Sequence, residues 1–126
     1  MTNSHYLTEK EISHFIESLK KEHKEIEAWL KVKHSEVLSI ASDNSGSDII
    51  DLASNHEEYL STKREIERRT ARKLEIEERL RDTQDFGYCD DCGIEIGAKR
   101  LNINHAFKLC IDCSEFNQEK ARNYIK

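Results

Sequence analysis

The sequence has no proline, and its 126 residues include one tryptophan, one methionine and four glycines. Because proline is the residue that most strongly interrupts a helix, its absence leaves long helices possible. No apolar run approaches the roughly 18 residues that a membrane-spanning helix needs, and residues 1–10 lack the apolar core of a secretory signal. We therefore expect a cytoplasmic protein without a membrane span, whose thiols stay reduced.

Apolar residues are barely more common than charged ones. Charged side chains make up 36% of the chain and hydrophobic residues 37%, a balance typical of an elongated helical body with little interior. The formal net charge is −5. This charge argues against a protein that wraps nucleic acid through counterion release, although a local basic patch can still bind a partner.

The cysteines of the chain form two C-x2-C pairs that are separated by 17 residues. They are Cys89, Cys92, Cys110 and Cys113. This spacing turns four thiolates toward one point and is typical of a tetrahedral zinc site. Gly93 follows the first pair, where a tight turn often needs a positive φ. Four protein ligands leave no open position for water, so we expect one structural Zn²⁺ per chain and no enzyme.

Two other interpretations of the cysteines carry less weight. Disulfide bonds are unexpected in a reducing compartment. A redox C-x-x-C pair would lie at the start of a helix beside a βαβ unit, and no such alternation surrounds either pair. His105 is a further candidate ligand, but the four thiols already complete the coordination shell.

A long helix is predicted from Glu9 onward, because Thr8 and Glu11 have the spacing of a capping box. Its side chains repeat in steps of three and four residues, as in a heptad seam. The seam comprises Ile12, Ile16, Leu19, His23, Ile26, Leu30, Lys33, Val37 and Ile40. Residues 42–47 favour turns and end the pattern.

A second long helix follows, capped by Ser47 or Asp48. Its stripe at seven-residue intervals comprises Leu52, Tyr59, Ile66, Lys73 and Leu80. A short connection between two long helices predicts an antiparallel hairpin, here a coiled coil over residues 1–83.

Polar residues dilute the seam of this hairpin. They are His23, Lys33, His56, Lys63, Thr70 and Glu77. We interpret them as long side chains that reach solvent from a thin interface, because the short loop already sets the antiparallel pairing. The alternative is that a polar seam holds the two helices in register.

Residues 84–126 predict a small zinc-finger module and a C-terminal helix. Six apolar residues alternate loosely enough for two short strands, namely Ile94, Ile96, Leu101, Ile103, Phe107 and Leu109. The expected core of the module is Phe86, Tyr88 and Phe107. The pattern is helical from Ile111 onward, and we expect Phe116 and Tyr124 to anchor this helix near the start of the first one. The predicted fold class is therefore mainly α.

The segment between the two helices, near residues 43–53, is acidic. It carries Asp43, Asp48 and Asp51, and no lysine or arginine occurs between Lys33 and Lys63. An acidic residue near a helix start complements the helix dipole, which explains Asp48 alone equally well. Asp48 together with Asp51 leaves the first turn doubly negative, which favours a functional tip.

These residues resemble the DksA/TraR family of RNA polymerase regulators. The segment Asp48-Ile49-Ile50-Asp51-Leu52-Ala53 is similar to the D-x-x-D-x-A motif at the tip of that family's coiled coil. Phe86-Gly87-Tyr88-Cys89 and Leu109-Cys110-Ile111-Asp112-Cys113 are similar to the flanks of its zinc finger. The resemblance covers essentially the whole chain, with tip and finger in the expected order.

The resemblance implies a factor that binds RNA polymerase directly and inserts its tip through the secondary channel. Such a factor changes the stability of promoter open complexes and binds no specific DNA sequence. By position, Asp48, Asp51 and Ala53 would act near the polymerase active centre. Arg68 and Arg69, in the basic stretch of residues 63–73, would belong to the docking side, although a solvated face paired with neighbouring glutamates explains that stretch equally well. An internally paired hairpin should be a monomer.

The family also connects to the stringent response, since longer members contact the alarmone ppGpp through basic residues. Lys73 matches one such position, but Asn104 and Ser114 stand where arginine and lysine are expected. His105 replaces a proline that is usual in the family's finger. The resemblance therefore implies a polymerase partner and leaves ppGpp dependence open.

Three alternatives remain at this point. A Gre-like transcript-cleavage cofactor also has an acidic hairpin tip, and Asp48 with Asp51 can hold a hard cation, but the cleavage factors lack a zinc finger. The cysteine spacing also resembles GATA-like DNA-binding fingers, yet residues 86–126 hold six acidic and six basic side chains, whereas a phosphate-facing module is basic. A redox sensor that releases zinc on thiol oxidation is compatible with the main function.

Overall fold

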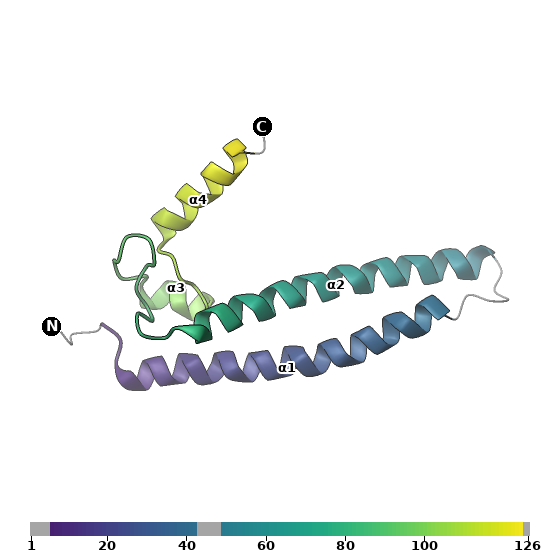
Figure 1. Ribbon diagram of the computed structural model, residues 1–126, viewed down its shortest axis with the longest axis horizontal. Coiled ribbons are helices and arrows are strands. Elements are labelled where there is room, and N and C mark those ends of the chain that lie inside the picture. Colours follow the sequence, from purple (N-terminus) through teal and green to yellow (C-terminus); the bar gives the residue numbers. More distant parts are fainter. Residues whose placement is uncertain (1–5, 43–48, 125–126) are drawn as a thin grey trace. The chain divides into compact units, whose positions relative to one another are not determined.

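A computed structural model describes residues 6–42 and 49–124, with side chains described for residues 6–39 and 55–122. Four helices follow one another along these ranges (Figure 1): α1 (Glu9–Ser42), α2 (Ile49–Arg81), α3 (Ala98–Ile103) and α4 (Ile111–Tyr124). No strand forms in the described ranges, where an isolated antiparallel bridge joins Tyr88 to Glu95. The predicted mainly α fold class is confirmed. A search of the described residues finds no helix that is long and apolar enough to cross a membrane.

The start of α1 is capped as the sequence predicts. The backbone N–H of Thr8 donates to Glu11 Oε1 at 2.9 Å, and the backbone N–H of Glu11 donates to Thr8 Oγ1 at 3.1 Å. Two amide groups that the helix itself cannot satisfy are thus paired reciprocally. The capping-box prediction and the helix start at Glu9 are confirmed.

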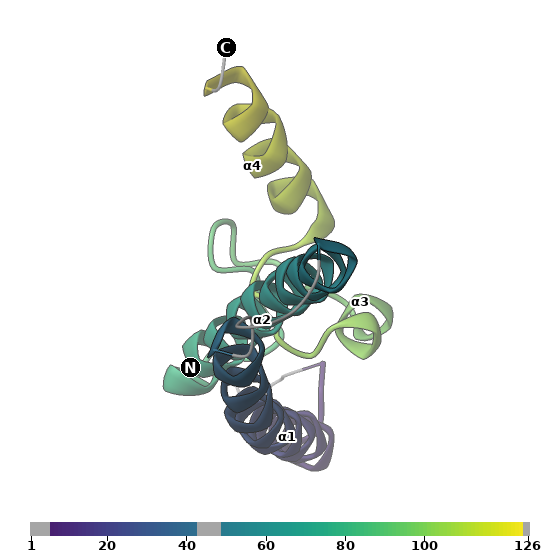
Figure 2. The same cartoon turned by 90° about the vertical axis from the view of Figure 1, so that its right-hand side faces the viewer.

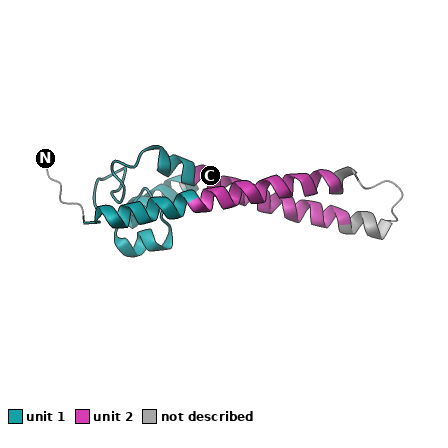
Figure 3. Cartoon of the chain, turned by 90° about the horizontal axis from the view of Figure 1, so that it is seen from below, with its two compact units in different colours: residues 1–20, 76–126 teal, residues 21–75 magenta. Residues whose placement is uncertain are grey.

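The chain divides into two compact units (Figure 3). Unit 1 combines residues 1–20 with residues 76–126, and unit 2 consists of residues 21–75. Both long helices therefore contribute to both units. The sequence analysis divided the chain near residue 83, whereas unit 1 combines residues from both sides of that position.

In unit 2, α1 and α2 run antiparallel and lie side by side (Figures 1 and 2). Glu22 pairs with Arg72, while Trp29, further along α1, contacts Arg69, which lies earlier on α2. Ile26 and Leu30 are buried in this unit, as their seam positions predict. The antiparallel hairpin is thus held by a narrow apolar seam with polar contacts on its edges.

The polar residues of the seam behave largely as the snorkelling interpretation predicts. Lys33 pairs with Glu36 at 3.0 Å, and Lys63 lies over the ring of Tyr59, each within its own helix. Contacts that bridge the two helices involve cations of α2, among them Lys73, which occupies a stripe position of that helix. These are Arg72 with Glu22, Lys73 with Glu27 and Arg69 with Trp29.

The core of unit 1 is assembled from segments that lie far apart in the sequence. Its buried apolar side chains are Leu7, Phe15, Leu19, Ile76, Phe86, Ile96, Leu101 and Ala106. The ring of Phe15 stacks on Phe86 at 5.9 Å between centroids and also contacts His105 at 4.7 Å. The sequence-based seam placed Ile16 in the interface, whereas the neighbouring Phe15 is the buried residue.

The prediction of two short strands after the first cysteine pair is wrong. Residues 98–103 form α3 instead, in which Leu101 is fully buried and Ile103 is 81% exposed. Short apolar runs cannot be assigned to strand or helix from periodicity alone. Gly97, with a φ of 101°, is the N-cap of this helix, which begins at Ala98.

The predicted C-terminal helix is present as α4, but Phe116 does not anchor it. Phe116 is 65% exposed, and every residue from 115 to 122 is exposed. The side chain of Tyr124 lies outside the described residues. Only the first turn of α4 is partly shielded, because that turn carries part of the cysteine cluster.

Candidate metal centre

The first knuckle of the finger is a tight backbone turn between Cys89 and Ile94. The N–H of Cys89 donates to the carbonyl of Ile94 at 2.8 Å, and the N–H of Gly93 donates to the carbonyl of Cys89 at 2.9 Å. Gly93 has a φ of 80°, a conformation that residues with a Cβ rarely adopt. The predicted need for a glycine after the second thiol is confirmed.

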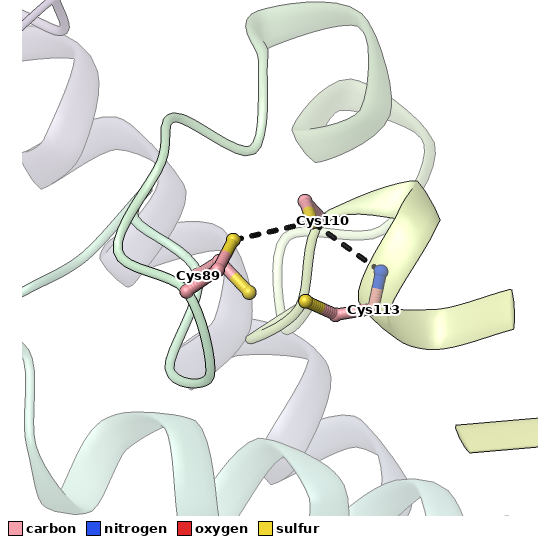
Figure 4. A group of neighbouring side chains, drawn as sticks. Cys89, Cys110 and Cys113 are labelled. Carbon is pink, nitrogen blue, oxygen red and sulfur yellow. Dashed lines mark hydrogen bonds between the residues drawn. The ribbon is translucent and has the colours of Figure 1, made fainter. Parts of the chain in front are cut away.

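The second knuckle is the start of α4. The N–H of Ser114 donates to the carbonyl of Cys110 at 2.9 Å, and the N–H of Cys113 approaches Cys110 Sγ at 3.4 Å. Figure 4 shows Cys110 and Cys113 at this helix start, with Cys89 facing them from the loop that follows α2. One helical turn is thus enough to place two thiols on the same side.

The four thiols meet at one point. The sulfur atoms of the two C-x2-C pairs all lie within 4.8 Å of one another, and Cys92 Sγ lies 3.7 Å from Cys110 Sγ. Sulfur ligands at the ~2.3 Å bond length of a tetrahedral zinc site lie about 3.8 Å apart. The cysteines are free rather than disulfide-bonded. The arrangement fits a four-thiolate metal site and not a pair of disulfides.

The electrostatics of the cluster call for a cation. Burial opposes ionisation of Cys89, but hydrogen bonds from the backbone of Cys110, Cys92 and Asp91 outweigh it and lower the pKa of the Cys89 thiol to about 6. Contact with the Cys110 thiol, and then with the other two, raises the pKa of Cys113. Four gathered thiols therefore cannot all ionise unless a metal ion neutralises them.

The donor set selects the metal and its role. Four thiolates in tetrahedral proximity suit Zn²⁺, and they leave no coordination position for water or substrate. Cys89 and Cys110 are 4% and 3% exposed, so half of the ligand set lies within the core of unit 1. A zinc ion bound here links the two knuckles and stabilises the fold.

His105 is not part of the cluster. Its Nδ1 atom lies 2.7 Å from the carbonyl oxygen of Leu101, and its ring packs on Phe15. His105 thus joins the finger to α1 inside unit 1.

The remaining predicted site residues are placed less completely. Asp48 lies outside the described residues, while Asp51 and Ala53 lie in the first turns of α2 with side chains that are not described. Arg68 is exposed on α2, and the Arg69 guanidinium lies 5.1 Å from the centroid of the Trp29 ring.

Three residues that bear on the site were missed by the sequence analysis. The Tyr6 hydroxyl contacts the backbone on both sides of the first knuckle, and Leu7 beside it is buried. The burial of Leu7 could have been predicted, because an apolar residue directly before a capping box often packs against the helix. No sequence pattern indicates the contacts of Tyr6, because its hydrogen-bond partners are more than 80 residues away along the chain.

The third missed residue is Arg79, which is 2% exposed near the end of α2. Its guanidinium lies over the ring of Phe86 and donates to the carbonyl of Asp82. Its Nε and Nη1 atoms have no hydrogen-bond partner among the described residues, and burial lowers its pKa. No helical pattern predicts a buried arginine beside Leu80, because charged residues are rarely fully buried.

Known proteins resemble this chain both in its finger and over most of its length. Residues 84–116 match the model of the prokaryotic dksA/traR C4-type zinc finger. The chain is 39% identical over 114 residues to the RNA polymerase-binding transcription factor DksA of Haemophilus influenzae, covering 86% of this chain and 74% of the relative. It is 33% identical over 115 residues to the protein of that name in Escherichia coli K12, covering 86% and 72%.

A solved structure shows the same fold. Transcription factor DksA2 from Pseudomonas aeruginosa superposes with a TM-score of 0.75 at 28% sequence identity, covering 93% of this chain and 90% of that one. The C4-type finger and the four gathered thiols agree on one structural Zn²⁺. With identity to relatives that extends well beyond the finger, the chain belongs to the DksA/TraR family.

Proposed function

We propose that this protein regulates transcription by binding bacterial RNA polymerase directly. The observation that carries the proposal is the extent of the similarity. It runs over 86% of the chain, through hairpin and finger together, to proteins named RNA polymerase-binding transcription factors. A polymerase partner would place the working protein in the cytoplasm, and the four-thiolate metal would serve the fold rather than catalysis.

The proposed mechanism separates a structural head from an acidic tip. The zinc-bearing unit would hold the protein on the polymerase, while the segment between α1 and α2 passes through the secondary channel. Asp48 and Asp51, with Ala53, would then alter the stability of the promoter open complex from a position near the active centre. Asp51 belongs to the first turn of α2, so its backbone is held by a helix of 33 residues.

The proposed docking side of α2 is narrower than its basic stretch. Arg72 is engaged by Glu22 at 2.7 Å and by Glu75 at 2.6 Å, and Arg69 lies over Trp29. Arg68 is exposed and forms no ion pair with an acidic side chain of the described residues. We therefore assign the docking contact to Arg68 first, with Arg69 shaping the surface beside it.

Replacing Arg68 with alanine tests this assignment. We expect about tenfold weaker polymerase binding, the effect of one lost charge pair of ~1.4 kcal/mol at an interface. Lys31→Ala, which removes an exposed charge from α1, is the matched control. Equal binding by the Arg68 variant and the wild type would contradict the assignment.

We further propose that ppGpp has at most a secondary role. Lys73, which matches a ppGpp-contacting position of the family, lies 3.6 Å from Glu27 across the hairpin. Asn104 and Ser114 carry no charge at the other two expected positions. A titration of ppGpp in the assay below measures this dependence.

The decisive experiment measures the lifetime of open complexes at a ribosomal RNA promoter with purified polymerase. We expect the wild type to shorten the lifetime, and Asp51→Asn to bind polymerase without shortening it. Asp43→Asn removes an acid from the same segment outside the D-x-x-D-x-A motif and should behave like the wild type. Absence of polymerase binding by the wild type would end the proposal.

The same purified components test the Gre-like alternative, with which the acidic tip is also compatible. Cleavage of RNA in backtracked complexes that requires Asp48 and Asp51 would favour it. The DNA-binding alternative is weaker, because the finger shares its core with α1 and α2 rather than forming a separate module. Binding to duplex DNA alone that falls steeply with salt would favour that alternative.

A further inference from the structure

The segment that precedes α1 lies against the finger. The Tyr6 hydroxyl donates to the carbonyl of Gly87 at 2.7 Å, across 81 residues of sequence, and accepts from the N–H of Gly97 at 3.2 Å. The Tyr6 ring also meets Tyr88 edge-on, with centroids 5.6 Å apart. One side chain from the N-terminal end thus makes three separate contacts with the metal-bearing loop.

The two glycines that Tyr6 joins flank the first knuckle, the turn between Cys89 and Ile94. Between Gly87 and Gly97 lie the first two zinc ligands and the hydrogen bond from Cys89 to Ile94. The carbonyl of Gly87 accepts a second hydrogen bond, from the N–H of Ile96 at 2.9 Å. The Tyr6 hydroxyl therefore closes the base of a loop whose width sets where its two thiols lie.

The segment before α1 packs closely against Gly87. A Cβ atom on Gly87 would lie 2.9 Å from Leu7 Cδ1 and 3.0 Å from the Tyr6 hydroxyl oxygen. A Cβ atom on Gly97 would meet nothing within 4 Å. Leu7 is itself 3% exposed. The chain before α1 thus occupies the space that a side chain at Gly87 would fill.

We propose that Tyr6 is a positioning residue of the zinc site. Its hydroxyl holds the two segments that flank the first knuckle, at Gly87 and Gly97, at the separation that Cys89 and Cys92 need in order to bind the metal together. Ordering a loop costs free energy when a ligand binds, and a contact that orders the loop beforehand removes part of that cost. The zinc-binding unit is therefore discontinuous, and metal affinity depends on a residue far outside residues 84–116.

The test compares Tyr6→Phe with Tyr59→Phe in the full chain. Both substitutions remove one hydroxyl and keep the ring, but Tyr59 belongs to unit 2. Competition with a chromophoric chelator measures the dissociation constant for Zn²⁺. We expect about tenfold weaker zinc binding for Tyr6→Phe, at the lower end of the effects seen for groups that support metal ligands, and no change for Tyr59→Phe. Equal affinities for Tyr6→Phe and the wild type would overturn the proposal, and so would equal losses in both variants.

A second measurement uses the wild type, so its result does not depend on whether a variant folds. Hydrogen exchange is followed with zinc bound and after chelation. We expect the amides of residues 12–20 at the start of α1 to lose protection with the metal, while those of residues 24–36 in unit 2 keep theirs. If residues 12–20 exchange equally in both states, the start of α1 is not coupled to the zinc site and the proposal is wrong. Neither measurement involves polymerase.

Discussion

Units 1 and 2 are built from the same two long helices, yet they are stabilised in different ways. Unit 1 buries eight non-cysteine apolar side chains, drawn from α1, α2, the finger and the segment before α1, around a four-thiol metal site. In the described part of unit 2, Ile26 and Leu30 are the buried apolar residues, and charged side chains edge the seam. A single helix can thus take part in a true core at one end and in a thin two-helix interface at the other.

This difference indicates where the protein tolerates change. A two-helix interface has little interior, so its residues contribute by small and separable amounts. A small core closed by a metal depends on every large residue and on the metal itself, because it cannot bury enough surface unaided. We expect substitutions and metal removal to act strongly on unit 1 and weakly on unit 2.

Removal of zinc should have the largest effect. Binding of a structural zinc ion contributes on the order of 10 kcal/mol to the folding of small finger domains, so chelation should unfold the core around Phe86. Tyr59 lies in unit 2, so near-ultraviolet circular dichroism of the tyrosines is recorded on a Tyr59→Phe variant, in which it reports on unit 1. Fluorescence of Trp29, the single tryptophan, reports on unit 2. An equal loss of both signals would break the distinction between the units.

Truncation of a core ring should come next. Phe86→Ala removes a ring that is 1% exposed and stacks on Phe15, and we expect a loss of about 3–5 kcal/mol in the free energy of unfolding. Phe116→Ala, on the exposed face of α4, is the matched control and should change stability by less than about 0.5 kcal/mol. Chemical denaturation of the zinc-loaded protein measures both, and similar losses would mean that α4 is packed in solution.

The glycines of the finger separate steric fit from backbone strain. Gly87→Ala and Gly97→Ala both place an alanine at a positive φ, which costs about 1–2 kcal/mol. Gly87→Ala also drives a Cβ atom against Leu7 and the Tyr6 hydroxyl, so we expect an additional loss of about 1–2 kcal/mol. Thermal unfolding compares the two variants. Equal losses would show that the segment before α1 is not closely packed.

The cross-helix ion pair of unit 2 should contribute modestly. Arg72 donates to both oxygens of Glu22, at 2.7 and 2.9 Å, but the two side chains are 24% and 41% exposed. A double-mutant cycle with Glu22→Gln and Arg72→Gln should give a coupling of about 0.5–1 kcal/mol that weakens with added salt. A coupling several times larger would indicate that unit 2 depends on polar contacts more than on its seam.

The smallest effect concerns pH. Burial raises the pKa of Tyr6 above its ordinary value of 10.0, so the folded state keeps this proton more tightly than the unfolded chain. The contribution of Tyr6 is therefore complete below about pH 10, and it falls as the pH rises through the raised folded-state pKa. Denaturation of the zinc-loaded protein between about pH 9 and pH 11 should show a decline that is reduced in Tyr6→Phe. An identical decline in both would assign the effect to other groups.

Several features of the fold were predictable because their causes are local. The capping box at Thr8 and Glu11 involves residues three apart, and the hairpin follows from a heptad pattern that is interrupted once. The zinc ligands were predictable because two C-x2-C turns bring their thiols together whatever surrounds them. In each case the interacting groups lie within a few residues of one another or share one metal ion.

Other features depended on contacts across the chain. Periodicity could not choose between Ile16 and its neighbour Phe15, because the choice depends on Phe86 and His105, which stack on the latter. The segment of α3 was predicted as a strand because its apolar alternation is short. The burial of Arg79 follows from Phe86 and the carbonyl of Asp82, neither of which a helical pattern locates.

By itself the sequence determined the two long helices, the C-terminal helix and the metal, since helix length, capping and cysteine spacing are set by neighbours along the chain. Tertiary structure alone decided how unit 1 is assembled, with the start of α1, the end of α2 and the finger sharing one core. It also decided that the Tyr6 hydroxyl joins Gly87 and Gly97. The physical reason is that such contacts become favourable only after distant segments have come together around the metal, and no local pattern records them.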